Sequence, residues 1–153
     1  MEGPSPTQAI LEGLRGLKHE KWGWVIYRCT YADDKAWTRF KDIINKRSHE
    51  EIAEFDSPEL ANTLEWTYVE DCDTLDGISI PQLRTRFQAW AADAIRTENP
   101  RAEGLGLVNH GYPRYSYFIE IDEDALRRVV YEAPQPPAHD EVDIGHVKFV
   151  KAD

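Results

Sequence analysis

The chain has 153 residues, of which 30% are charged and 11% are aromatic, and its formal net charge is −10 at pH 7. This length suits one domain whose core needs no disulfide framework. Because the overall field repels phosphates and anionic lipid, and no basic cluster offsets it, we expect neither nucleic acid nor a membrane as a partner.

The amino-terminal segment is predicted to form a helical arm. Ser5-Pro6-Thr7-Gln8 has the pattern of a capping box with proline at the first helical position. Apolar residues follow at helical spacing, and Gly13 and Gly16 weaken the helix. We therefore expect residues 1–21 to form a short arm and residues 22–153 to form a single α+β domain.

The same segment bears on the location of the protein. It has no continuous apolar run, and Glu2 precedes its first leucine, which is not the pattern of a secretory signal peptide. No later stretch approaches the roughly 20 apolar residues of a membrane span. Cys29 and Cys72 are the only cysteines, and without an export signal we expect both to be reduced. We predict a cytoplasmic protein, with the nucleus as the alternative, that is not secreted.

The stretch from Trp22 to Trp37 is the most informative part of the sequence. Residues 24–31 are mostly β-branched or aromatic, which is typical of a strand buried on both faces. We predict that this strand lies in the middle of a sheet. Asp33 or Asp34 then offers a carboxylate to the free amides of a helix over residues 35–46, whose apolar side chains share one face.

A second strand and a polar loop are predicted next. Leu64, Trp66 and Tyr68 alternate with their neighbours at the period of a strand that has one face on the core. The loop over residues 71–77 is rich in carboxylates and resembles a calcium-binding loop. A ligand, a glycine and a glutamate are missing from the positions that such a loop requires. We therefore predict no metal site.

The clearest predicted helix begins at a second capping box, Ser79-Ile80-Pro81-Gln82, and ends at Glu98-Asn99-Pro100. Its apolar residues, from Leu83 to Ile95, form one stripe along the helix. The loop after it is rich in glycine and in apolar residues, and we expect it to cover another part of the fold.

The last third of the chain is predicted to contain two more strands. Residues 114–121 alternate so that two tyrosines and two isoleucines share one face of a strand. Asp122 is predicted to cap a short helix. The proline-rich residues 133–138 indicate a stiff connector, and the alternation over residues 146–151 indicates an edge strand.

Strands and helices therefore alternate along the chain, with two helices long enough to cover a sheet. We predict an α+β fold: a four-stranded, mostly antiparallel sheet covered by helices, in the manner of a ferredoxin-like sandwich. A doubly wound sheet is the second choice, because the chain is short and the second and fourth strands have the pattern of half-exposed strands.

The predicted site is built around Arg28, the one charge within the apolar central strand. Two interpretations are open: a buried ion pair with Glu65 or Glu120, or an anchor for a carboxylate or phosphate ligand. In the second interpretation, aromatic side chains complete a pocket around the guanidinium. The predicted ligand-binding residues are Arg28, Tyr27, Tyr31, His110, Tyr115 and Tyr117.

His110 is the one candidate for a catalytic residue. It lies between the glycine-rich loop and an aromatic strand, where an imidazole can act as a general acid or base near neutral pH. No local motif ties it to a serine, a cysteine or a carboxylate. Cys29 has no base beside it and is predicted to be inert. No motif indicates a cofactor.

Two segments carry a resemblance to known proteins. They are the opening Trp-Gly-Trp-Val-Ile-Tyr-Arg-Cys-Thr-Tyr with the following Asp-Asp and Trp37, and Tyr-Phe-Ile-Glu-Ile-Asp-Glu-Asp-Ala-Leu over residues 117–126. They resemble a family of small, uncharacterised proteins of filamentous fungi, over most of the chain from Trp22 onwards. The resemblance implies an intracellular setting and transfers no catalytic residue.

Two functions are consistent with these observations. The first is a small cytosolic module that binds a small apolar ligand or a protein partner at an aromatic-lined site and does no covalent chemistry. The second is a cofactor-independent isomerase, cyclase or hydrolase that acts on an apolar small molecule, with one acid or base in a dry pocket. A homodimer whose sheets pack face to face is considered for the second function.

Overall fold

The structure, a computed structural model, describes residues 23–53, 64–98, 113–136, 138, 144–145 and 147–153. The expected helical arm over residues 1–21 and the loop that carries His110 lie outside these residues. In the part of the chain that is described, no helix is both long and apolar enough to cross a membrane.

A four-stranded sheet forms the middle layer of the fold, in the order β2-β1-β3-β4. β1 (Val25–Arg28) lies between β2 (Thr67–Val69) and β3 (Tyr117–Ile121), and β4 (Lys148–Lys151) lies at the far edge. The sequence prediction of a central strand within residues 24–31 and of an edge strand near the carboxyl terminus is confirmed. All four residues of β1 are buried.

The strand directions differ from the prediction. β1 runs parallel to both β2 and β3, and only β3 and β4 are antiparallel. The sheet is therefore mixed, and the expectation of a mostly antiparallel sheet is wrong. Its second strand has the half-buried pattern of a sheet edge, and that pattern is the same for a parallel and an antiparallel neighbour.

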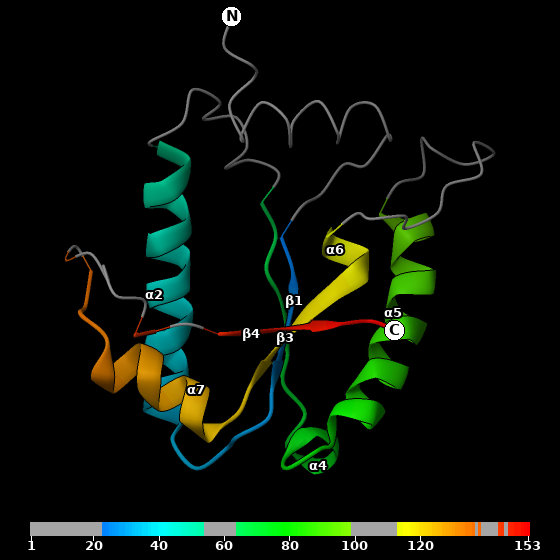
Figure 1. Cartoon of the computed structure of the whole chain (residues 1–153), viewed down its shortest axis with the longest axis horizontal. Helices are drawn as coiled ribbons and strands as arrows, with labels where there is room; N and C mark the ends of the chain where they lie inside the picture. The colour runs from blue at the N-terminus through cyan, green and yellow to red at the C-terminus, as the bar shows by residue number, and fades with distance from the viewer. Residues whose placement is uncertain (1–22, 54–63, 99–112, 137, 139–143, 146) are drawn as a thin grey trace, which may run out of the picture.

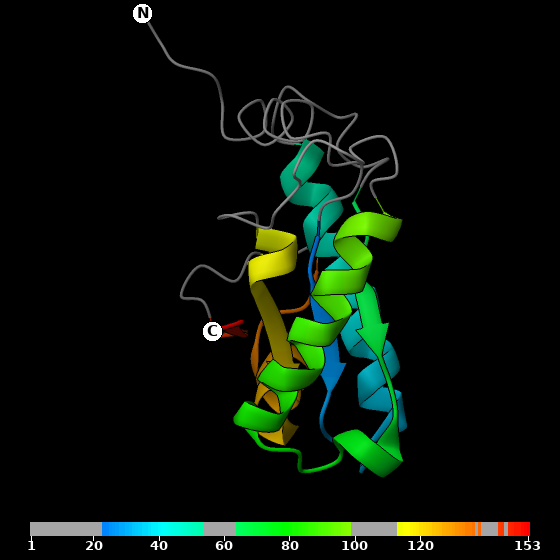
Figure 2. The ribbon, with the colours of Figure 1, turned by 90° about the vertical axis from the view of Figure 1, so that its right-hand side faces the viewer.

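Helices cover both faces of the sheet. α2 (Asp34–Ala53) connects β1 to β2 on one face, and α5 (Ile80–Thr97) connects β2 to β3 on the other. Figures 1 and 2 show the sheet between these two helices. Parallel neighbours require such crossover connections. The ferredoxin-like sandwich, which carries its helices on one face, is not supported, and the connections from β1 to β3 follow the doubly wound pattern.

Each face of β1 contributes to a separate core. Val25 and Tyr27 pack with Phe87 and other α5 side chains, whereas Ile26 packs with Trp37 and its neighbours on α2. Alternate side chains of a strand point to opposite faces. Odd-numbered residues of β1 therefore face α5, and even-numbered residues face α2.

Local signals predicted the helix starts. The Asp33 carboxylate accepts a hydrogen bond from the Ala36 amide, and Ser79 forms the predicted capping box at the start of α5. Asp122 likewise caps α7 (Glu123–Arg127), which continues as the π-helix η2 (Arg128–Glu132). These caps satisfy amides that have no partner within the helix.

Three local expectations are corrected. α2 is longer than the helix predicted over residues 35–46: it continues through the charged residues after Lys46, and Ile52 near its end is buried. The predicted polar loop contains a short helix, α4 (Cys72–Leu75). Tyr115 lies in the helical turn α6 (Pro113–Ser116) instead of in the third strand.

Candidate functional site

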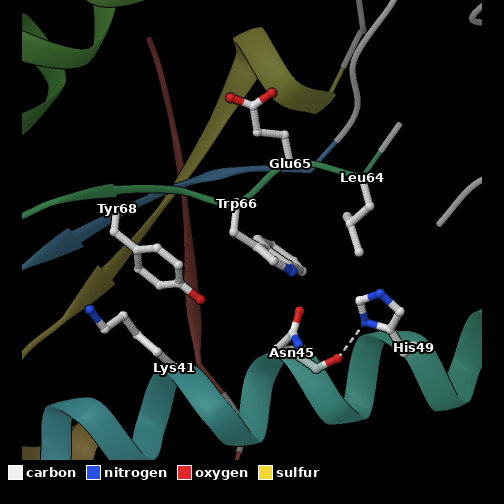
Figure 3. A pocket seen from close by; sticks show the side chains of 7 residues that line it. All are labelled: Lys41, Asn45, His49, Leu64, Glu65, Trp66 and Tyr68. Carbon is white, nitrogen blue, oxygen red and sulfur yellow. Dashed lines mark hydrogen bonds between the residues drawn. The ribbon is translucent and has the colours of Figure 1, made fainter. Parts of the chain in front are cut away.

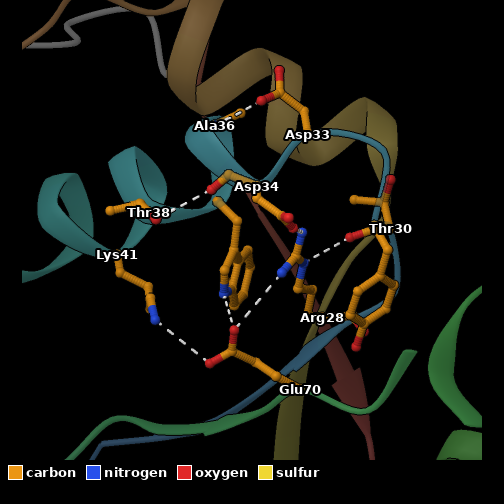
Figure 4. Close-up of polar contacts among 10 residues, drawn as sticks. Arg28, Thr30, Asp33, Asp34, Ala36, Thr38, Lys41 and Glu70 are labelled. Atoms are coloured by element: carbon orange, nitrogen blue, oxygen red, sulfur yellow. Dashed lines mark hydrogen bonds and ion pairs between the residues drawn. The ribbon is translucent and has the colours of Figure 1, made fainter. Parts of the chain in front are cut away.

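Arg28, the last residue of β1, is held by the chain's own carboxylates. Its side chain is 7% exposed, and its Nη2 lies 2.6 Å from Asp34 Oδ1. Its Nη1 lies 3.8 Å from Glu70 Oε1, and its Nε donates a hydrogen bond of 2.8 Å to the Thr30 carbonyl (Figure 4). The ion pair expected for a buried arginine is present, and its partners are Asp34 and Glu70 instead of Glu65 or Glu120.

Aromatic rings complete the surroundings of Arg28. Its guanidinium carbon lies 4.4 Å from the centre of the Tyr31 ring and 5.2 Å from that of Trp37. The Trp37 indole N–H donates to Glu70 Oε1 at 2.5 Å, and Lys41 Nζ lies 3.5 Å from Glu70 Oε2 (Figure 4). Such contacts satisfy a buried guanidinium without a ligand.

The position of this cluster matters because open sheets with parallel strands usually bind ligands outside the carboxyl ends of those strands. Arg28 ends β1 and Glu70 directly follows β2, so both lie at that edge. The side chains of the cluster are joined to one another between these two strands. Arg28 is therefore paired with protein groups and offers no free charge to a ligand there.

The other predicted site residues do not gather around Arg28. Tyr27 lies on the opposite face, where its ring packs edge-on against Phe118 at 5.5 Å and burial raises the pKa of its phenol to about 12. Tyr115 belongs to the same core and donates to Glu98 Oε1 at 2.8 Å. Tyr117 begins β3 opposite Lys151. Of the described candidates, Tyr31 contacts the Arg28 guanidinium, whereas Tyr27 and Tyr115 belong to the core that faces α5.

A cavity of about 410 Å³ lies between α2 and the edge strand β2. Figure 3 shows α2 below it and the β2 segment above it. Its lining consists of Lys41, Asn45 and His49 from α2, and of Leu64, Glu65, Trp66 and Tyr68 from the β2 segment. The helix residues are spaced four apart, so they share one face of α2, and the strand residues 64, 66 and 68 share the facing side of the sheet edge.

The apolar wall of the cavity is fixed from behind by ring contacts. Trp66 stacks on Trp24 with ring centres 5.7 Å apart, and Tyr68 meets Trp37 edge-on at 5.9 Å. Trp24 also meets Phe149 of β4 edge-on at 5.2 Å. These contacts restrict the rotamers of Trp66 and Tyr68, so the wall is largely formed before any ligand arrives.

Hydrogen-bond donors lie along the same wall. Burial, with a smaller contribution from Glu70, raises the pKa of Tyr68 to about 12, so its hydroxyl stays protonated and can donate at neutral pH. The Trp66 indole N–H is buried and has no hydrogen-bond partner among the described residues. An unpartnered buried donor is costly and calls for an explanation.

Two residues of α2 complete the polar lining. His49 Nδ1 lies 2.8 Å from the Asn45 carbonyl oxygen. A carbonyl only accepts hydrogen bonds, so Nδ1 carries the proton and Nε2 is left for the cavity. Lys41 Nζ lies 5.6 Å from the centre of the Tyr68 ring. Figure 3 shows the Glu65 carboxylate pointing away from these groups, to the other side of the strand.

Sequence reasoning did not select these cavity residues. The alternation of Leu64, Trp66 and Tyr68 and the four-residue spacing of Lys41, Asn45 and His49 were both visible signals. The strand residues and the helix residues meet because α2 packs against the edge strand β2. That packing depends on the order of the strands in the sheet and on the parallel direction of β1 and β2. Only the fold supplies that order.

Among the described residues, neither a metal cluster nor an activated Cys29 thiol is present. Within the described residues there is no group of three or more histidine, cysteine, aspartate or glutamate side chains that could hold a metal ion. Burial raises the pKa of the Cys29 thiol to about 12. The thiol therefore stays protonated near neutral pH and is a poor nucleophile.

The described residues thus define an α+β domain with an open mixed sheet and an aromatic pocket between its edge strand and one covering helix. Comparisons of the chain with protein-family models, with curated proteins and with solved structures find no match. The resemblance to small proteins of filamentous fungi therefore stays a prediction.

Proposed function

We propose that the protein is a binding module that takes a small organic ligand into the cavity between α2 and β2 and does no covalent chemistry on it. The observation that carries this proposal is the convergence of an aromatic wall, Trp66 and Tyr68, with polar groups of α2 around one cavity. A volume of about 410 Å³ lies within the range of roughly 300–1,000 Å³ found for small-molecule sites.

The lining residues support binding more directly than catalysis. Among those that the structure describes there is no serine, threonine, cysteine or aspartate to serve as a nucleophile. The groups present are suited to holding a planar molecule and to orienting its polar atoms. A small number of fixed polar groups on an apolar wall is the usual arrangement for ligand recognition.

A cofactor-independent enzyme is the second candidate, and His49 is the observation that favours it. Its Nδ1 donates to the Asn45 carbonyl, which leaves Nε2 on the side of the cavity as the candidate acid or base. One such group in a pocket is enough for an isomerase or a cyclase. A cytoplasmic location and a protein partner or homodimer stay predictions.

The test is a thermal-shift screen of the full chain against a metabolite library. A ligand at 100 times its dissociation constant adds about 2.7 kcal/mol, which raises the melting temperature by roughly 5–10 °C for a chain of this size. Asn45→Phe places a ring in the cavity and should abolish the shift. Lys46→Phe places the same ring on the next residue of α2, which does not line the cavity, and should retain it.

Each outcome bears on the proposal. A shift that is lost in Asn45→Phe and kept in Lys46→Phe supports binding in this cavity. Conversion of the hit, detected by mass spectrometry, would favour the enzyme. No hit in the library, or hits that respond equally to both variants, would contradict the proposed site.

A further inference from the structure

We propose that the ligand of this cavity is a small planar organic anion, an aromatic acid whose ring lies on the Trp66 and Tyr68 wall and whose carboxylate meets the donors around it. This inference rests on the proposed function and adds the chemical class of the ligand. It depends on the character of the polar groups, on the unpartnered indole, and on the charges nearby.

The polar groups are biased towards donors. Tyr68 keeps its proton, Trp66 has only a donor, and Lys41 has three donors and no acceptor. Figure 3 shows the Tyr68 hydroxyl and the Asn45 amide directed towards the same space. The amide of Asn45 can either donate or accept, so it adapts to what the others require. His49 Nε2 is an acceptor in the same lining. The donors Tyr68 and Lys41 are matched by a ligand group that only accepts, and a carboxylate is that group.

The Trp66 indole is a buried donor that has no partner among the described residues. Figure 3 shows its nitrogen on the edge of the ring that faces Asn45 and His49. Within a domain the loss of a hydrogen bond to water must be offset by another acceptor. The nitrogen has almost no accessible surface in this structure, so an acceptor in the cavity reaches it only if the Trp66 ring shifts. The stacked neighbour Trp24 has an unpartnered N–H as well, but Trp24 is not among the lining residues.

The local charges favour an anion over a cation. An aromatic wall in an acidic protein is also suited to an alkylammonium ligand, which binds over ring faces. Here Lys41 already lies over the Tyr68 ring, and a second cation beside it would be repelled. Glu70, the nearest described carboxylate to Lys41, is shared with Arg28 and Trp37. The carboxylate of Glu65 points away from the cavity.

The net charge of −10 does not oppose this conclusion. Salt reduces the field of distant charges over a Debye length of about 8 Å at physiological ionic strength. The groups within contact distance of the ligand therefore decide its charge preference. Those groups are the Lys41 ammonium, which is shared with Glu70, the neutral Tyr68 hydroxyl and Asn45 amide, and the acceptor Nε2 of His49.

The experiment compares three probes with the same ring system: 1-naphthoate, 1-naphthamide and 1-naphthylmethylammonium. Dissociation constants are measured by calorimetry for the full chain and for Lys41→Met. Lys46→Met is the matched control, because it removes a lysine of α2 that does not line the cavity. We expect the naphthoate to bind at least about tenfold more tightly than the amide, since a hydrogen bond to a charged group is stronger by that order.

The variants separate charge from the indole donor. Lys41→Met should weaken naphthoate about tenfold and leave the amide nearly unchanged, whereas Lys46→Met should change neither. Trp66→Phe keeps a ring and removes the N–H, so it should weaken both probes. In the unmodified protein, naphthoate should shift the indole N–H resonance of Trp66, identified by its absence in Trp66→Phe, and this readout does not depend on the stability of the variant.

Three results would overturn the inference while leaving the proposed function intact. The first is tighter binding of the ammonium or amide probe, and the second is an unshifted Trp66 resonance when naphthoate is bound. The third is that none of the three probes binds, whereas a library compound binds the unmodified protein and not Asn45→Phe. The cavity is then a ligand site, and the proposed ligand class, a planar aromatic acid, is wrong. If nothing binds at all, the proposed function fails with it.

Discussion

Arg114 and Glu98 form a bidentate ion pair that joins α6, directly before β3, to the end of α5. Arg114 Nη2 lies 2.6 Å from Glu98 Oε2, and its Nε lies 2.8 Å from Oε1. The same guanidinium donates to the carbonyl oxygens of Gly23 and Glu65 at 3.2 and 2.9 Å. Arg114 is 1% exposed, so this one side chain ties the residues that precede β1 and β2 to the helix that crosses behind them.

Removal of this arginine should be strongly destabilising. Arg114→Met removes two of the hydrogen bonds that the Glu98 carboxylate accepts, and only that from Tyr115 is retained among those described; the carbonyls of Gly23 and Glu65 also lose this donor. Loss of one partner of a buried pair costs about 3–5 kcal/mol. Urea unfolding followed by circular dichroism measures the change. Arg39→Met is the matched control, because Arg39 is exposed and pairs only with groups at the surface, and it should cost less than about 1 kcal/mol. Similar losses for the two variants would contradict the structural role given to Arg114.

Two glycines test how closely the segment before β1 approaches β2. Gly23 has φ of 104°, and an added Cβ would lie 2.4 Å from the Glu65 carbonyl oxygen. Gly77 has φ of 71° and open space around the same position. Gly77→Ala should cost only the strain of a left-handed residue, about 1–2 kcal/mol. Gly23→Ala adds a backbone clash, so we expect it to cost at least about 3 kcal/mol or to prevent folding.

The measurement is the midpoint of urea unfolding for both alanine variants, with the soluble yield as a second observation. A Gly23→Ala protein as stable as Gly77→Ala would mean that the two segments are not in contact as described. Both comparisons use the same substitution, so differences in helix or strand propensity of alanine do not enter.

The parts of the fold that the sequence predicted are those that depend on neighbouring residues. Asp33, Ser79 and Asp122 each cap a helix within three or four residues of themselves, and the buried strand at β1 is a continuous run. Strand direction has no such local signal. An alternating strand such as the one near Tyr68 looks the same whether its neighbour is parallel or antiparallel, so the mixed sheet could not be deduced.

The predicted site around Arg28 differs from the observed cavity between α2 and β2 for a related reason. The alternation through Tyr115 and Tyr117 indicates a strand, but Arg114 is drawn into the pair with Glu98, and residues up to Ser116 form a helical turn. Tyr115 consequently packs in the α5 core. Contacts between residues distant in sequence decide both this turn and the cavity between α2 and β2, and no pattern within one segment reports them.

Alkaline pH should destabilise the protein through its buried phenols. Burial raises the pKa of Tyr27 and of Tyr68 from 10.0 to about 12. Between these values the unfolded chain has lost the proton and the folded chain has kept it, so unfolding releases protons and stability falls as pH rises. The stabilising contribution is complete below pH 10 and is lost through about pH 12.

Tyr27→Phe should reduce this loss by on the order of 2 kcal/mol, since one pKa unit corresponds to about 1.4 kcal/mol. Urea unfolding at a series of pH values between neutral and strongly alkaline conditions measures it. Tyr131→Phe is the comparison, because Tyr131 is 59% exposed and its pKa is raised mainly by a hydrogen bond to Asp33 and less by burial. Its removal should change the alkaline loss of stability less than Tyr27→Phe does. If the free energy of unfolding of Tyr27→Phe falls with pH as steeply as that of the unmodified protein, the Tyr27 phenol does not cause the loss of stability.

The two carboxylates that face Arg28 should contribute unequally. The Asp34 side chain is 86% exposed, whereas that of Glu70 is 36% exposed. Asp34 lies closer to the guanidinium, but water screens it, so Asp34→Asn should cost less than about 1 kcal/mol. Glu70 also accepts from the Trp37 indole and pairs with Lys41, and Glu70→Gln should cost about 1–3 kcal/mol.

Urea unfolding at low and high salt distinguishes the two variants: the loss of stability in Asp34→Asn should shrink with salt, and that in Glu70→Gln should persist. The reverse order would mean that distance to Arg28, and not burial, governs the strength of this cluster.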